Sequence, residues 1–170
     1  MKLFRCFLIV SFFFLSFSTG FCKVNRPPVT MEFDACFIHA GQRYQIDPKL
    51  LKVISQKESS LIPGIVNYNR DKKGKIISID YGLMQVNSGH IPELKNMGII
   101  REKKELLDNP CLNIHIGAWI LAKHFKKCGV NWSCLGSYNA GFDEKNEVSR
   151  MNYARGIYER YVPGVKKSSG

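Results

Sequence analysis

The 170-residue chain contains 25 lysines and arginines against 14 aspartates and glutamates, which gives a formal net charge of +11. A positive field of this size favours anionic partners: nucleic acid, a membrane surface or an acidic polymer outside the cell. Apolar residues make up 45% of the sequence and aromatic residues 12%, a composition that excludes a disordered chain.

The first 22 residues have the pattern of a secretory signal peptide. Residues 1–5 carry two positive charges, residues 7–17 form an almost continuous apolar run, and the small residues Ser18 and Gly20 follow. The apolar run is shorter than the roughly 20 residues that cross a bilayer, so a retained anchor is the weaker interpretation. We therefore predict export to the periplasm without a stable membrane anchor, and no nucleic acid as partner.

One folded domain is predicted for residues 23–165, because about 150 residues form a single domain with a core of its own. No internal repeat and no linker divides this stretch. Residues 166–170 are lysine, serine and glycine, and we predict that they form a disordered tail.

Four cysteines of this domain are candidates for disulfides, because cysteines of exported chains usually pair. Zinc is the rival interpretation, but no pair has the close spacing of a structural zinc site. Four cysteines allow three pairings, and the sequence leaves all three open, although a short staple across the last two is plausible. The candidates are Cys36, Cys111, Cys128 and Cys134.

The domain is predicted to be mainly helical, because its apolar residues recur at the spacing of one helical face. Asp47 before Pro48 is a typical helix start, and Ser88 and Ser133 are predicted to cap two later helices. The most apolar helix is expected to be the central one. We predict helices at 33–44, 47–58, 88–97, 110–127, 133–138 and 149–161, and a hairpin or extended loop inserted at 67–81.

Glu58 lies at an unusual place in the second predicted helix. It follows Ile54 by four residues and Leu51 by seven, so it emerges on the apolar face. A carboxylate on such a face is costly unless it is hydrogen-bonded, paired or protonated. The pattern therefore makes Glu58 a candidate catalytic acid, whereas most glutamates at helix ends are solvent-exposed surface residues.

Three motifs follow one another along the helical domain. They are Glu58-Ser59-Ser60, then Gly82-Leu83-Met84-Gln85-Val86-Asn87, then Tyr138-Asn139-Ala140-Gly141. In this order they resemble the lytic transglycosylases with a goose-lysozyme-like domain, above all the small specialised enzymes of the IagB and IpgF type that accompany type III secretion and related systems. The resemblance covers nearly all of the chain after the leader.

The resemblance implies an α+β fold, mainly α: a lysozyme-like helical domain with a small β-hairpin beside the active-site cleft. It also implies that Glu58 protonates the glycosidic oxygen of peptidoglycan and then acts as a base on the muramic 6-hydroxyl, which gives a 1,6-anhydro product. The substrate-binding residues that it implies are Ser59, Met84, Gln85, Asn87, Tyr138, Asn139 and Tyr153.

Asp80 is a second candidate catalytic residue, because many glycosidases use two carboxylates. It ends the predicted hairpin directly before the second motif. If it faces the substrate, it stabilises the transition state or positions a water, and the enzyme becomes a hydrolase of the lysozyme type. The alternative is a turn-capping role, which aspartates often have at strand ends.

The expected partners are peptidoglycan glycan strands and, by resemblance, a component of a secretion system or pilus. No cofactor or metal is expected, because the four histidines lack the spacing of a ligand set. A non-catalytic wall-binding scaffold with the same fold stays open as the alternative from another functional class.

Overall fold

The computed structural model describes residues 32–162. The predicted signal peptide at 1–22, Cys22 and the predicted tail at 166–170 lie outside the described residues. The described elements, in chain order, are α2 (Asp34–Tyr44), α3 (Pro48–Ser59), β1 (Val66–Arg70), β2 (Ile76–Tyr81), β3 (Val86–Asn87), η1 (Ser88–His90), α4 (Ile91–Asn96), α5 (Glu105–Asp108), α6 (Pro110–Cys128), α7 (Trp132–Ala140), η2 (Glu144–Asn146) and α8 (Glu147–Tyr161). This is the mainly helical α+β architecture that the sequence predicts.

Helix α6 is the central element, as its apolar character predicts. It begins at Pro110, where Asn109 caps it by accepting a hydrogen bond from the backbone N–H of Leu112. Its buried residues face several sides, and α2 and α7 both pack against it. Gly117 is required in α6 because a Cβ there would lie 2.5 Å from the Cβ of Met84.

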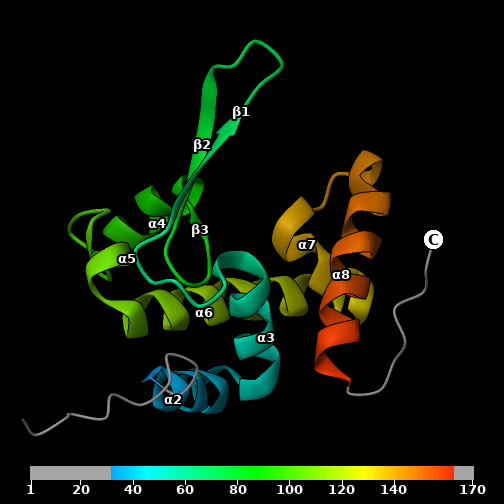
Figure 1. Cartoon of the computed structure of the whole chain (residues 1–170), viewed down its shortest axis with the longest axis horizontal. Helices are drawn as coiled ribbons and strands as arrows, with labels where there is room; N and C mark the ends of the chain where they lie inside the picture. The colour runs from blue at the N-terminus through cyan, green and yellow to red at the C-terminus, as the bar shows by residue number, and fades with distance from the viewer. Residues whose placement is uncertain (1–31, 163–170) are drawn as a thin grey trace, which may run out of the picture.

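Helix α3 begins as predicted, because the Asp47 carboxylate accepts a hydrogen bond from the backbone N–H of Lys49 at 2.8 Å. Its inner face buries Leu51, Val53 and Ile54 in the common core. In Figure 1 α3 stands between the β-strands and the pair α7 and α8. The C-terminal end of α3 therefore reaches the space between these two parts.

The predicted hairpin is the larger part of a three-stranded antiparallel sheet with the order β1-β2-β3. In its register Asn67 faces Asp80 and Asn69 faces Ser78, while Asp80 faces Asn87 on the other side. Figure 1 shows β1 and β2 projecting from the helical body, so the hairpin stands beside the helices and does not lie between them. The short strand β3 is not foreseen by the sequence.

Two predicted helix caps are wrong. Ser88 is the first residue of η1 and not its cap: its hydroxyl accepts a hydrogen bond from the backbone N–H of Ile79, and Asn87 caps η1. Asn131, not Ser133, caps α7 by accepting from the backbone N–H of Cys134. In each case an asparagine and a serine lie close together and both are good N-caps, so the local sequence does not decide which residue caps the helix.

The four cysteines form two disulfides, which settles the pairing that the sequence leaves open. Cys36 pairs with Cys111 and ties α2 to the start of α6. Cys128 pairs with Cys134 and staples the end of α6 to α7. Both bonds therefore fix helices around the central one.

Within residues 32–162, no helix combines the length and apolar character needed to cross a bilayer.

Candidate active site

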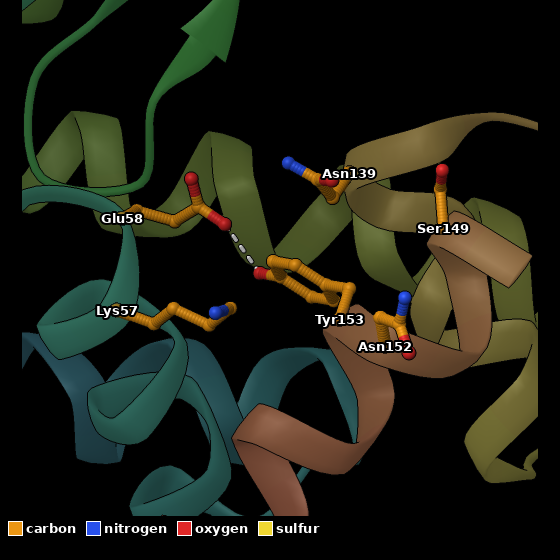
Figure 2. Close-up of a pocket in the computed structure, with 6 residues that line it drawn as sticks. All are labelled: Lys57, Glu58, Asn139, Ser149, Asn152 and Tyr153. Carbon is orange, nitrogen blue, oxygen red and sulfur yellow. Dashed lines mark hydrogen bonds between the residues drawn. The ribbon is translucent and has the colours of Figure 1, made fainter. Parts of the chain in front are cut away.

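Glu58 lies in the last turn of α3 and is partly buried. Tyr153, from α8, donates a hydrogen bond from its hydroxyl to the Glu58 carboxylate (Figure 2). The Nζ of Lys57 lies 5.3 Å from the centre of the Tyr153 ring. One aromatic side chain therefore contacts both the carboxylate and the neighbouring ammonium group.

The environment of Glu58 favours its protonated form. Burial raises the pKa of the Glu58 carboxyl, and the negative charge of Asp80 adds to this effect. The Tyr153 hydrogen bond and the positive charge of Lys57 act in the opposite direction, but burial is the largest cause and the pKa lies above its ordinary value. A carboxyl group with a raised pKa is suited to donate a proton.

A cavity of about 570 Å³ lies between the sheet and α7. Its lining brings together residues that lie far apart in the sequence: Glu58, Asn69, Arg70, Ile77, Ser78, Asp80, Gln85, Asn87, His90, Tyr138 and Asn139. We call this cavity the hairpin side of the cleft. The cavity gives Glu58 and Asp80 access to the same bound molecule.

Asp80 is held by two asparagine side chains. Its carboxylate accepts hydrogen bonds from the Nδ2 of Asn69 at 2.7 Å and from the Nδ2 of Asn87 at 2.6 Å. Each of these Nδ2 atoms also donates to the Ser78 hydroxyl at 3.0 Å. Asp80 therefore accepts hydrogen bonds from side-chain amides on both neighbouring strands. It lies on the middle strand of the sheet and not at a turn.

The Gly82–Asn87 motif forms a tight turn against α6. Gly82 has a φ of 72°, and a Cβ there would lie 2.5 Å from the Nδ2 of Asn113. Gln85 also has a positive φ, 48°, and its Nε2 donates to the carbonyl of Gly82 at 2.7 Å while its Oε1 accepts from Asn67. The buried Asn113 side chain fixes the turn by bonding the carbonyl of Tyr81 and the N–H of Met84. Only glycine fits the first position of this turn.

Helix α7 supplies the opposite wall. The Tyr138 hydroxyl donates a hydrogen bond to the carbonyl of Met84 at 2.8 Å, which joins the third motif to the second. Burial raises the pKa of Tyr138, so this hydroxyl stays protonated as a donor. Asn139 follows and lines the cleft beside Glu58.

A second cavity, of about 440 Å³, lies on the other side of Glu58, where α3 faces α8. Its lining consists of Lys57, Glu58, Asn139, Ser149, Asn152 and Tyr153 (Figure 2). We call it the α8 side of the cleft. Because both cavities include Glu58 and Asn139, the carboxyl group stands where the two sides meet.

Comparison with known proteins gives the same fold and family. The transglycosylase SLT domain model matches residues 35–161. The Escherichia coli peptidoglycan-binding-like protein is 54% identical over 128 residues, covering 75% of this chain and 77% of its own. Protein IpgF of Shigella flexneri is 39% identical over 127 residues, covering 75% of this chain and 79% of its own. The chain belongs to the transglycosylase SLT domain family.

Two further similarities agree with this assignment. Invasion protein IagB of Salmonella typhimurium is 41% identical over 126 residues, which is 74% of each chain. Among solved structures, the lytic transglycosylase Slt of Pseudomonas aeruginosa superposes with a TM-score of 0.57 at 18% identity, over 78% of this chain and 24% of that one. The predicted resemblance is confirmed: the protein is a lytic transglycosylase of the SLT family, with a peptidoglycan-modifying function.

Most of the predicted site residues of this transglycosylase line the two cavities, but two do not. Met84 is fully buried against α6. Ser59 is 3% exposed, and its hydroxyl donates to the carbonyl of Leu83 at 2.8 Å. Neither residue lines the two cavities, and both support the turn from behind.

The sequence prediction missed several polar residues of the cleft. Lys57 precedes Glu58 directly, and Ser149 and Asn152 line the same cavity from α8, where Ser149 lies one helical turn before Tyr153. Asn69 is not among the predicted site residues, although its side chain holds Asp80. Helical spacing from Tyr153 could have found Ser149, but only the sheet register brings Asn69 to Asp80.

A metal centre has no support among the residues from 32 to 162, because they contain no cluster of three or more His, Cys, Asp and Glu placed to hold an ion. His124 has a packing role instead. Its ring Nδ1 lies 2.7 Å from the Ser137 hydroxyl, and burial lowers its pKa to about 4. His124 therefore packs as a neutral side chain behind the cleft.

Proposed function

We propose that this lytic transglycosylase cleaves the MurNAc-β-1,4-GlcNAc bond of peptidoglycan and leaves 1,6-anhydro-MurNAc ends. The observation that carries the proposal is the position of Glu58. A carboxyl group whose pKa burial raises stands where two cavities meet, each large enough to hold part of a glycan strand. A general acid with such a pKa accelerates proton transfer to a leaving group.

In this proposal Glu58 performs both proton transfers. Its protonated form donates to the glycosidic oxygen as the bond to the muramic C1 breaks. The resulting carboxylate then accepts the proton of the muramic 6-hydroxyl, whose oxygen closes onto C1. Tyr153 holds the carboxyl group in place through both steps, because its hydroxyl donates to the carboxylate.

A hydrolase is the second candidate, and one observation favours it. Asp80 lines the same cavity as Glu58, and two asparagines fix the direction of its carboxylate. A second carboxylate opposite the acid is the arrangement that glycosidases use to stabilise the transition state or to activate water. In that case C1 receives a hydroxyl from water instead of the muramic 6-oxygen.

We further propose that the enzyme is exported to the periplasm and opens the wall locally for the assembly of a secretion system or a related machine. One similar protein, IagB, is named an invasion protein, and the sequence motifs resemble the enzymes of the IagB and IpgF type that accompany type III secretion. The two disulfides support export, because cytosolic proteins rarely keep such bonds. Detection of the mature protein in a periplasmic extract, with Glu58→Gln cells failing to assemble the machine, tests this part.

The test of the reaction is mass spectrometry of the soluble products that the purified protein releases from peptidoglycan, with the Glu58→Gln variant as control. Glutamine keeps the shape of the side chain and removes the acidic proton. We expect anhydro-muropeptides from the unmodified protein alone. Products heavier by one water would favour the hydrolase, and the same digest with Asp80→Asn would then follow. Absence of product from both proteins would favour the non-catalytic scaffold.

A further inference from the structure

The α8 side of the cleft has a distinctive charge. Of the six residues that line it, Lys57 is the only cation and Glu58 the only acid, and Asn139, Ser149, Asn152 and Tyr153 complete the lining. Because the pKa of Glu58 is raised, the acid is more often neutral than an exposed glutamate. The cavity is therefore a polar site in which Lys57 supplies a positive charge beside the Glu58 carboxyl.

Lys57 is an exposed residue whose ammonium group lies over an aromatic ring of the cavity. Its ammonium group lies 5.3 Å from the centre of the Tyr153 ring, so it covers one face of that ring. Aromatic faces attract cations and also serve as stacking platforms for sugars. With Lys57 in this place, that face of Tyr153 is not available to a sugar, and the cavity offers charge and hydrogen bonds instead.

Gly156 on α8 makes room for this ammonium group. A Cβ at Gly156 would lie 3.2 Å from the Nζ of Lys57 and 3.5 Å from the guanidinium of Arg160. Arg160 donates a hydrogen bond to the carbonyl of Gly156. Two cations thus approach one glycine at the edge of the cleft, and neither takes part in a salt bridge within the described part of the chain.

Lys57 lines this cavity and takes part in no salt bridge within the described residues, so its ammonium group is placed to bind an anionic group of the substrate. The sugars of peptidoglycan carry no charge once the lactyl group is linked to its stem peptide, but the stem peptides carry free carboxylates. We propose that Lys57 binds a carboxylate of a stem peptide on the α8 side and makes the enzyme prefer peptide-bearing strands. This inference rests on the proposed function, and it specifies which form of peptidoglycan the enzyme prefers.

Ser149 and Asn152 fit this assignment. They lie on the face of α8 that points into the cavity and carry neutral hydrogen-bonding groups (Figure 2). A peptide backbone presents amide donors and acceptors that such groups satisfy. The carboxylate would thus be recognised by Lys57 and the adjoining amides by the two α8 side chains.

The test measures binding in a Glu58→Gln background, where the strand is not cleaved. Three probes of equal length are compared: peptide-bearing glycan strands, the same strands after an amidase has removed the peptides, and a chitin oligosaccharide. The second probe carries lactyl carboxylates and the third carries none. We expect Lys57→Met to weaken binding of the first probe by about three- to tenfold and to leave the other two within about twofold.

Other outcomes overturn the proposal in distinct ways. Equal weakening on all three probes, or no weakening, would mean that Lys57 does not recognise a carboxylate. Weakening confined to the amidase-treated strand would identify the lactyl carboxylate as the ligand and exclude the stem peptide. The proposed function would fail independently of this inference if the unmodified protein released no anhydro products although the expected binding pattern was observed.

Two matched variants separate charge from structure. Lys57→Arg keeps the positive charge, and we expect it to retain the preference for peptide-bearing strands. Gly156→Ala keeps the charge and favours the helix, and its Cβ at 3.2 Å from Nζ shifts the end of the Lys57 side chain by only a few tenths of an ångström, so we expect the preference to be retained. If Lys57→Arg loses the preference for peptide-bearing strands as Lys57→Met does, while Gly156→Ala keeps it, the positive charge of residue 57 is not what recognises the substrate.

Discussion

The hydroxyl of Tyr153 on α8 donates a hydrogen bond to the carboxylate of Glu58 on α3, across 95 residues of sequence. This contact joins the two helices that enclose one side of the cleft. It also opposes the effect of burial on Glu58, since a hydrogen bond to the charged carboxylate lowers its pKa. The final pKa of Glu58 therefore depends on a balance that single substitutions can shift.

Replacement of Glu58 by glutamine is expected to lower the rate of glycan cleavage by about 10²–10⁴-fold, because that is the usual contribution of a general acid. The melting temperature should stay the same or rise, since glutamine has no charge to desolvate at this partly buried position. Product release and thermal unfolding measured on the same preparation check both parts. If the variant has a much lower melting temperature, its loss of activity would reflect unfolding and not the missing acid.

The pH dependence of cleavage should follow the protonation of Glu58. The acid form is active, so kcat/KM is expected to decline as the pH rises through the Glu58 pKa, which lies above the ordinary value for glutamate. Tyr153→Phe removes a hydrogen bond that lowers this pKa. The declining limb should therefore move to higher pH in Tyr153→Phe, and a shift to lower pH would contradict the assignment of Glu58 as the acid.

The two asparagines that hold Asp80 provide a test of its role. If Asp80 acts on the substrate, Asn87→Ala should lower kcat because the carboxylate loses one of its two amide donors. The same substitution should have no further effect in an Asp80→Asn background, since the two residues then act as one unit. Additive losses in the double variant would mean that Asn87 acts by another route, such as direct contact with the glycan.

Asn113 is expected to matter for stability rather than for chemistry. Its fully buried side chain bonds the carbonyls of Tyr81 and Leu106 and the N–H of Met84. Asn113→Ala leaves these backbone groups buried without partners, which costs about 1–3 kcal/mol for each group. Urea unfolding should therefore show a loss above about 2 kcal/mol, and a smaller loss would mean that water replaces the amide.

The two disulfides should differ in their contribution to stability. Cys36 and Cys111 are 75 residues apart, whereas Cys128 and Cys134 are separated by 6. In the chain-entropy description, closing the longer loop stabilises by about 4 kcal/mol and closing the shorter one by about 2 kcal/mol. Unfolding of the two paired Cys→Ala variants should show this order, and the reverse order would point to strain or residual structure in the unfolded chain.

Several features of the fold could be predicted because they depend on neighbours in sequence. The cap of α3 at Asp47, the central α6 and the inward direction of Glu58 follow from caps and from apolar spacing along one helix. The motifs that contain Glu58, Gly82 and Tyr138 resemble those of lytic transglycosylases, and this resemblance gave the family. The sequence could not decide whether Asn131 or Ser133 caps α7, since both residues are good caps and they lie within one turn of each other.

The sequence by itself determined the family and the candidate acid Glu58, because the motifs that carry the resemblance are short and local. Only the tertiary structure decided which residues meet: Cys36 with Cys111, Asp80 with Asn69 and Asn87, and Lys57 with the face of Tyr153. The physical reason is that these contacts depend on strand register and on the packing of helices around α6, which no local pattern specifies.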